Sequence, residues 1–204
     1  MLADRRRKKW IVQDSTHIAF KEWAVVCAAL SEGRQTLILR KGGIHEGQGG
    51  FQVEHGEFWL FPTYVHQDDA GVIEDALPLL DRARRERPPD DLVRISHYAV
   101  VEQALEVRDP ALAENLAGQH IWSAHAVDAR FHYRRPGLYV LPVRIYRVPQ
   151  PFELPNSEYF AGCRSWVELP MDLPTAGLQP VLDDEESARR LAAIRDAVAP
   201  TRLV

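Results

Sequence analysis

The amino-acid sequence predicts an α+β fold, with a mixed, mainly antiparallel curved sheet or small open barrel and a few flanking helices. Short runs rich in β-branched and aromatic residues recur along the chain and are separated by glycine and proline turns. Only a few segments carry the spacing of an amphipathic helix. Hydrophobic residues make up 46% of the 204 residues, which is enough to form a sizeable core.

The first third of the chain contains three kinds of element. Residues 18–30 are apolar, and they favour strand through Trp23 and Val25 but helix through their alanines. The turn at residues 31–34 precedes a predicted strand at 36–40, so a hairpin is the simplest interpretation. Residues 51–53 and 58–61 are two further predicted strands that flank a polar turn.

The middle and end of the chain alternate between predicted helices and predicted strands. Ile73, Ala76, Leu77 and Leu80 follow helix spacing, and Pro78 predicts a kink or two short helices. The predicted strands that follow cover residues 92–107, 121–133, 137–148 and 164–169, with a short helix at 109–116 and a loop at 149–155. Asp183 with Glu186 resembles a capping box that opens a last helix.

Two segments divide the sequence by composition. Residues 1–17 form a basic flexible arm with five consecutive cations, and residues 18–204 form a single α+β domain. No apolar run is long enough for a secretory signal or a membrane helix, which predicts a cytoplasmic protein without membrane association. The net charge of −4 argues against a protein that mainly coats nucleic acid, yet it leaves room for a local basic face.

Several sequence words resemble a known bacterial family. They are AFKEWAV at 19–25, LRKGGI at 39–44, FWLFPTYVHQ at 58–67, HIW at 120–122, VRIYR at 143–147 and GCRSWV at 162–167. Together they resemble the bacterial domain-of-unknown-function family numbered 1802, over roughly residues 19–169. The resemblance implies a bacterial cytosolic protein without an assigned activity, so it supplies no catalytic residue. The order of short strands and helices also looks like the PUA-like barrels, including the ASCH group, which often handle RNA or modified bases.

The first functional hypothesis is a nucleic-acid-binding module for DNA or RNA. Aromatic side chains would stack unpaired bases and arginines would hold phosphates, which requires both on one exposed face. The candidates are Arg40, Lys41, Trp59, Tyr64, Arg130, Arg144 and Arg147. The competing interpretation places the tryptophans in the core.

The alternative hypothesis is a metal-dependent phosphodiesterase or nucleotide hydrolase. Glu54, Glu57 and His66 would hold a divalent metal, and Lys41 and His66 would act in catalysis, with Lys41 steadying phosphate charge. No familiar phosphate-binding, zinc-protease or hydrolase motif supports it. Lys21 and Glu22, beside Trp23, are interpreted as an ion pair rather than as a catalytic pair.

Overall fold

The computed structural model describes residues 13–41, 54–65, 67–162 and 164–199. Within them, eight strands form one mixed, mainly antiparallel and unclosed sheet, which confirms the predicted fold class. The sheet order is β2-β6-β4-β3-β1-β7, and β5 and β8 also pair with β6. The strands are β1 Ser15–Trp23, β2 Leu37–Arg40, β3 Glu57–Thr63, β4 Leu92–Val101, β5 Leu105–Val107, β6 Leu138–Pro155, β7 Trp166–Pro174 and β8 Gln179–Pro180.

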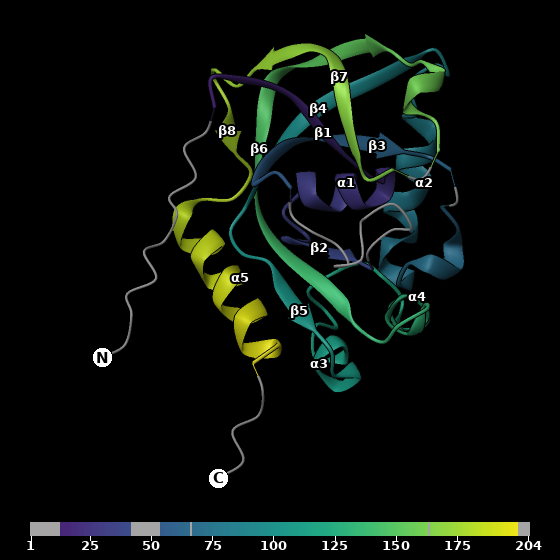
Figure 1. Cartoon of the computed structure of the whole chain (residues 1–204), viewed down its shortest axis with the longest axis vertical. Coiled ribbons are helices and arrows are strands. Elements are labelled where there is room, and N and C mark those ends of the chain that lie inside the picture. The colour runs from purple at the N-terminus through teal and green to yellow at the C-terminus, as the bar shows by residue number, and fades with distance from the viewer. Residues whose placement is uncertain (1–12, 42–53, 66, 163, 200–204) are drawn as a thin grey trace.

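The helices lie around this curved sheet (Figure 1). They are α1 Ala24–Ser31, α2 Leu77–Arg85, α3 Pro110–Glu114, α4 Ala124–His132 and α5 Asp184–Ala197. There are also three 3₁₀ turns in the described residues: η1 Asp69–Gly71 and η2 Glu74–Ala76 lie between β3 and α2, and η3 Glu158–Phe160 lies between β6 and β7. No helix of the described ranges is long and apolar enough to cross a membrane.

Alternation along β3 divides its side chains between two cores. Phe58 and Leu60 belong to the larger core, which α1 and α4 cover, whereas Trp59 and Phe61 belong to a smaller core on the other face. Successive strand side chains point to opposite faces, so this alternation fixes the register of β3. The strand predicted at residues 58–61 is confirmed.

Local chemistry explains two predictions that hold. Pro78 lies in the first turn of α2, where its missing N–H costs no hydrogen bond, and the preceding η2 gives the expected pair of short helices. The Asp183 carboxylate accepts the N–H of Glu186 at 2.8 Å and opens α5 as a cap.

The hairpin predicted across residues 31–34 is wrong. The chain leaves β1 at Trp23 and turns directly into α1, which buries Val25, Val26 and Leu30. β2 then pairs with β6 rather than with β1, while β1 pairs with β3 and β7. The segment that could be strand or helix is therefore both, with the change at residue 24.

The strand predicted at residues 121–133 is also wrong, because most of this segment is α4. The Ser123 hydroxyl accepts the N–H of Ala126 and caps the helix, and Val127 and Phe131 bury one face. Arg130 thus lies on a helix and not on a strand beside Arg144 and Arg147.

The loop predicted at residues 149–155 is part of β6. Its prolines are tolerated because the pairing of β6 with β4 shifts register between Ile95 and His97, opposite the stretch that contains Pro149 and Pro151. The strand predicted at 51–53 and the arm residues 1–12 lie outside the described residues. β1 begins at Ser15, inside the segment assigned to the arm.

Candidate functional site

A cavity of about 500 Å³ opens where the parallel strands β1 and β3 end together. Their register sets Glu22 opposite Pro62 and Trp23 opposite Thr63, so the two strand ends share one edge of the cavity. The end of β2, helix α4 and the segment around η3 complete the wall. The principal side chains of this basic cavity are Lys21, Glu22, Trp23, Arg40, Tyr64, Arg87, Arg130, Phe160 and Arg164.

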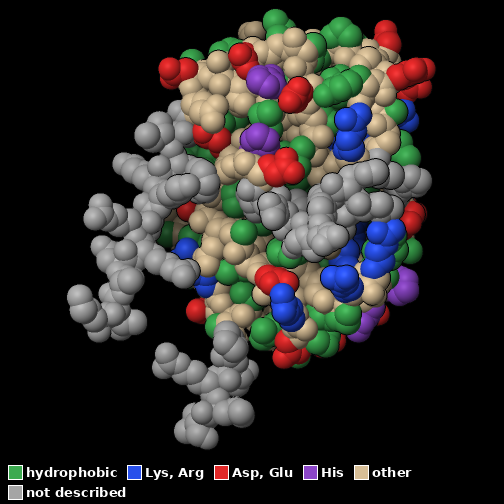
Figure 2. All heavy atoms as spheres, in the orientation of Figure 1, with side chains coloured by type: hydrophobic (Ala, Val, Ile, Leu, Met, Phe, Trp, Pro, Cys, Tyr) green, Lys and Arg blue, Asp and Glu red, His purple; other side chains and the backbone are tan. Residues whose placement is uncertain are grey.

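Positive charge dominates the basic cavity as far as the structure describes its wall. Five cationic side chains line it against a single carboxylate, that of Glu22. In Figure 2, several Lys and Arg side chains lie together on the face near α4. A concave wall of one charge focuses the electrostatic field and attracts anions, even in a protein whose net charge is −4.

The single carboxylate of the cavity is buried. The side chain of Glu22 is 2% exposed, and its Oε1 accepts the N–H of Trp23 at 2.7 Å. Its Oε2 lies 3.8 Å from an Arg40 guanidinium nitrogen and has no hydrogen-bond partner among the described residues. Glu22 is therefore held in place by its neighbours while one oxygen keeps hydrogen-bonding capacity.

Arg40 connects this carboxylate to the sheet. Its guanidinium donates to the carbonyl oxygen of Lys21 and lies 4.1 Å from the centre of the Phe20 ring. A guanidinium that stacks on an aromatic ring keeps its planar edge available for other partners.

Arg130 reaches the cavity from α4. Burial lowers the pKa of its guanidinium, the Arg40 charge lowers it further, and the charge of Glu22 opposes both effects. Its guanidinium carbon lies 3.8 Å from the centre of the Trp122 ring and 5.4 Å from that of Trp23. Two guanidinium groups therefore share the field of one buried carboxylate, which leaves an excess of positive charge on the wall.

The other three cations already have local partners. Lys21 Nζ donates to the carbonyl oxygens of Phe160 at 2.6 Å and Gly162 at 2.7 Å, which fixes the segment around η3 to β1. Arg87 forms an ion pair with Asp90, and Arg164 donates to the Tyr159 carbonyl at 3.5 Å. These charges add to the field of the cavity without all being available for direct contact.

Tyr64 supplies an aromatic wall beside the charges. Its side chain is half-buried, and burial is the main reason why the pKa of its hydroxyl is raised. The Arg87 guanidinium carbon lies 5.4 Å from the centre of its ring. Tyr64 is therefore a neutral phenol at physiological pH and a candidate stacking surface.

The structure brings three of the predicted nucleic-acid residues together, since Arg40, Tyr64 and Arg130 all line the basic cavity. Trp59 lies elsewhere: it is fully buried, and its indole N–H donates to the Thr16 carbonyl at 2.9 Å. It cannot stack a base without unfolding the smaller core.

The remaining predicted cations are also outside the cavity. Lys41 Nζ donates to the carbonyl oxygens of Phe131 at 2.7 Å and Gly137 at 2.8 Å, and to that of Arg135. Arg144 forms an ion pair with Asp184, and Arg147 is exposed on β6. Arg130 lies on α4 whereas Arg144 and Arg147 lie on β6, so these three arginines do not share one face of neighbouring strands.

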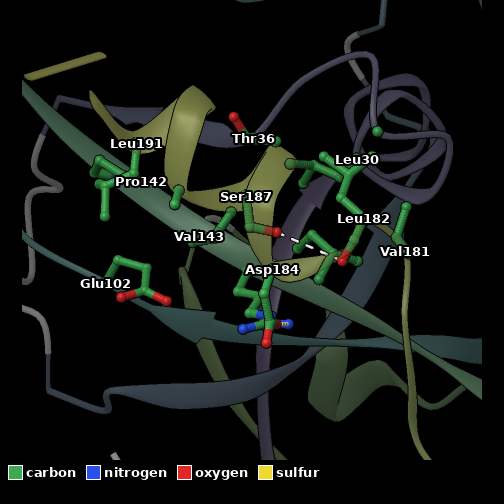
Figure 3. Close-up of a pocket in the computed structure, with 14 residues that line it drawn as sticks. Leu30, Thr36, Glu102, Pro142, Val143, Val181, Leu182, Asp184, Ser187 and Leu191 are labelled. Atoms are coloured by element: carbon green, nitrogen blue, oxygen red, sulfur yellow. Dashed lines mark hydrogen bonds and ion pairs between the residues drawn. The ribbon is translucent and has the colours of Figure 1, made fainter. Parts of the chain in front are cut away.

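Arg144 lines a smaller cavity, of about 180 Å³, between α5 and β6. Figure 3 shows the labelled side chains Pro142, Val143, Leu182 and Leu191 around it, with Asp184 at its edge. This cavity lies in the interface where α5 packs on the sheet, and the ion pair of Arg144 with Asp184 joins the first residue of α5 to β6.

Of the three predicted metal ligands, only Glu54 and Glu57 belong to the described residues, so the predicted metal site stays a prediction. The described residues contain no group of three His, Cys, Asp or Glu side chains placed to hold a metal ion. Glu54 is exposed, whereas Glu57 is 6% exposed and its Oε1 accepts the N–H of Gln13. His66 lies outside the described residues, so its predicted roles as ligand and catalyst stay predictions.

Sequence reasoning missed Glu22 and Trp23 as parts of a cavity, and it treated Lys21 only as the partner of Glu22. The signal was present in the alternation of β1. Phe20 and Glu22 point to the same side of the strand, so a charged residue falls on a face that is otherwise apolar. A carboxylate in such a position is rarely buried unless it is paired.

Comparison with known proteins places the chain in a family. The model of the family described as "Domain of unknown function (DUF1802)" matches residues 19–193, which confirms the resemblance to that family. No curated protein matches the chain.

Among solved structures, the crystal structure of ASCH from Zymomonas mobilis has 14% sequence identity and a TM-score of 0.39, covering 86% of this chain and 93% of that chain. A single-residue mutant of the same protein has 14% identity and a TM-score of 0.40, covering 89% and 98%. A second mutant has 13% identity and a TM-score of 0.41, covering 86% and 96%.

Proposed function

The chain belongs to the DUF1802 family, and we propose that it is a nucleic-acid-binding protein that holds an unpaired nucleotide in the basic cavity. Binding would then take place in the basic cavity rather than over a broad face of the sheet. Of the seven predicted nucleic-acid residues, it retains Arg40, Tyr64 and Arg130.

The observation that carries the proposal is that two guanidinium groups, those of Arg40 and Arg130, line the basic cavity with a single buried carboxylate, that of Glu22, which forms its ion pair with Arg40. Removing charged groups from water is costly unless they are compensated. Glu22 compensates one of the two, and a phosphate would compensate the other. Arginine suits this role because its planar fork of donors matches the oxygens of a phosphate.

The size and lining of the cavity favour a nucleotide over inorganic phosphate alone. A volume of about 500 Å³ falls within the range of small-ligand sites. Trp23 and Tyr64 offer aromatic surface on which a base could stack. A base must leave its stack to enter a concavity, so single strands are the expected ligands.

The test is fluorescence anisotropy with labelled single-stranded and double-stranded RNA and DNA, at two salt concentrations, with magnesium or with EDTA. We expect saturable binding of the single-stranded probes. The affinity should fall as the salt concentration rises and should not change with EDTA, and the probe should remain uncleaved. Arg130→Met should weaken binding about tenfold and reduce the slope of log affinity against log salt by about 0.7.

Arg147→Met is the matched control, because it removes an exposed cation outside the cavity. It should change the affinity less than about threefold, since a distant exposed charge is largely screened. Equal losses in both variants would show that binding follows overall charge rather than the cavity. Absence of binding to any probe at low salt would reject the proposal.

The hydrolase hypothesis has a separate outcome in the same experiment. Probe cleavage that requires magnesium and disappears in Glu54→Ala would support it. The exposed position of Glu54 and the buried position of Glu57 give it less support than the binding proposal receives.

A further inference from the structure

A third cavity, of about 610 Å³, lies between α3 and α4. Its wall is mostly apolar and includes Ile73, Ala113, Val127 and Phe131. Small residues on α3 and after it, such as Ala117 and Gly118, leave the space open. We call it the α3–α4 cavity, and none of its lining residues lines the basic cavity.

Two buried polar side chains line this cavity without hydrogen-bond partners among the described residues. His120 is 6% exposed, and its ring lies near the backbone carbonyl oxygens of His120 and Trp122 but makes no hydrogen bond of good geometry with any described residue. Trp122 is 1% exposed, and its indole N–H has no partner in the described part of the chain. Buried donors and acceptors are nearly always paired in folded proteins, so two unpaired side chains on one apolar wall indicate a ligand that pairs with them.

The charge of this cavity differs from that of the basic cavity. Burial lowers the pKa of His120 to about 4, despite the opposing effect of the nearby carbonyl oxygens of His120 and Trp122, so its ring is neutral at pH 7. The carboxylates of Glu114 and Asp128 also line the cavity, and His132 lies 3.3 Å from the Asp128 carboxylate. His125, the other titratable lining residue, lies on α4. Among the described residues, this wall carries no arginine or lysine to receive an anion.

We propose that the α3–α4 cavity is a binding site for an uncharged, planar nitrogen heterocycle. The apolar wall with Trp122 and Phe131 would contact the ring faces. A ring nitrogen would accept from the Trp122 N–H, and a ring N–H or nitrogen would pair with the neutral imidazole of His120. Anionic ligands such as nucleotides are disfavoured, because the described wall presents two carboxylates and no Lys or Arg side chain to them.

The site is independent of the proposed function, although the two cavities are close to each other. Trp122 lines the α3–α4 cavity, and its ring contacts the guanidinium of Arg130, which lines the basic cavity. The ligands differ in charge, so each cavity can be tested with a probe that the other excludes.

Isothermal titration calorimetry of the full chain with benzimidazole at pH 7.5 tests the proposal. Benzimidazole is neutral at this pH and carries one donor and one acceptor nitrogen. We expect saturable one-to-one binding, perturbation of the His120 ring signals in NMR spectra, and binding of benzimidazole-5-carboxylate that is weaker by about tenfold.

Two substitutions locate the binding. Ala113→Leu fills the cavity and should weaken benzimidazole binding about tenfold or more, whereas Ala192→Leu, at an exposed position of α5, should leave it unchanged. Trp122→Phe keeps an aromatic ring but removes the N–H, so binding should weaken about fivefold or more. Thermal melting checks that each variant folds, and Trp122→Phe decides the result should Ala113→Leu fail to fold.

The proposal is overturned by the absence of saturable benzimidazole binding to the unmodified chain. It is also overturned by binding that Ala113→Leu and Trp122→Phe both leave unchanged, or by equal affinity for the carboxylate. None of these outcomes bears on nucleic-acid binding at the basic cavity, which is measured with a different probe.

Discussion

The guanidinium carbon of Arg130 lies 3.8 Å from the centre of the Trp122 ring, and the ring is 1% exposed. Trp122 also contacts Trp23, whose ring centre is 4.7 Å away. Trp23 and Arg130 line the basic cavity, so Trp122 supports from behind both the aromatic and the cationic part of that wall. The position of one functional arginine therefore depends on a core aromatic residue.

Trp122→Leu should weaken nucleic-acid binding, because Arg130 loses the ring on which it is stacked. A buried cation–π contact contributes about 1–2 kcal/mol, which corresponds to roughly a fivefold to thirtyfold loss of affinity. The measurement is anisotropy with a single-stranded probe. In the double variant with Arg130→Met, the second substitution should add little, and full additivity would show that Trp122 does not act through Arg130.

Glu22→Gln should lower the stability of the fold without lowering the affinity for nucleic acid. The substitution leaves the partly buried Arg40 without its counter-charge, and breaking such a pair costs about 3 kcal/mol. Urea unfolding would measure the loss. Affinity for a single-stranded probe, measured where the variant is folded, should be equal or higher, because one negative charge leaves the cavity. A large loss of affinity would instead show that the carboxylate contacts the base directly.

Lys41→Met should reduce stability rather than affinity. Lys41 Nζ donates to carbonyl oxygens on both sides of the turn that joins α4 to β6, and the methionine keeps only the apolar stem. Hydrogen bonds from a charged donor contribute about 1.5–3 kcal/mol, so we expect a loss of about that size in urea unfolding. A variant with unchanged stability but no nucleic-acid binding would restore Lys41 to the predicted binding residues.

Gly33→Ala should be more destabilising than Gly118→Ala. Both glycines have a positive φ, +67° and +81°, which costs a residue with a Cβ about 1 kcal/mol. At Gly33 the added Cβ would also lie 2.6 Å from Leu182 Cδ2, whereas at Gly118 no atom of the described residues would lie within 4 Å of it. The difference between the two melting temperatures isolates the contact with Leu182, and equal values would show that Leu182 moves aside freely.

Stability should fall as the pH falls below about 6.5, the ordinary pKa of histidine. Burial, with help from the charge of Arg147, lowers the pKa of His97 to about 4 in the folded chain. The unfolded chain therefore binds a proton first, so the contribution of His97 is complete above pH 6.5 and is lost between about 6.5 and 4.

Comparison of urea unfolding at pH 7.5 and pH 5.0 measures this effect. The depressed pKa of His97 accounts for about 2 kcal/mol of the decrease between the two values. His97→Gln should shrink the decrease by that amount, while His120, whose pKa is lowered in the same direction, still contributes. An identical pH dependence in His97→Gln would contradict the assigned cause.

Sequence alone determined the features that depend on residues close to one another along the chain. The α+β class, the alternating strand at Phe58 to Phe61, the two short helices around Pro78 and the Asp183 cap follow from local spacing and capping chemistry, and the structure confirms them. The same local reading selected Arg40, Tyr64 and Arg130 as candidates by residue type. The sequence also suggested that Trp59 binds nucleic acid, whereas Trp59 is buried in the smaller core. Local spacing shows which residues share a face of a strand, but it does not show whether other parts of the chain pack over that face.

Tertiary structure decided everything that depends on pairing between distant segments. The parallel pairing of β1 with β3 joins Glu22 to Pro62, and the return of α4 brings Arg130 to the same place from more than a hundred residues away in the sequence. The sequence of α4 was predicted to be a strand because its valine and aromatic residues favour strands. The Ser123 cap and the packing of Phe131 outweigh that preference and stabilise a helix. The physical reason is that burial and charge compensation act through space, and no local pattern in a single sequence records them.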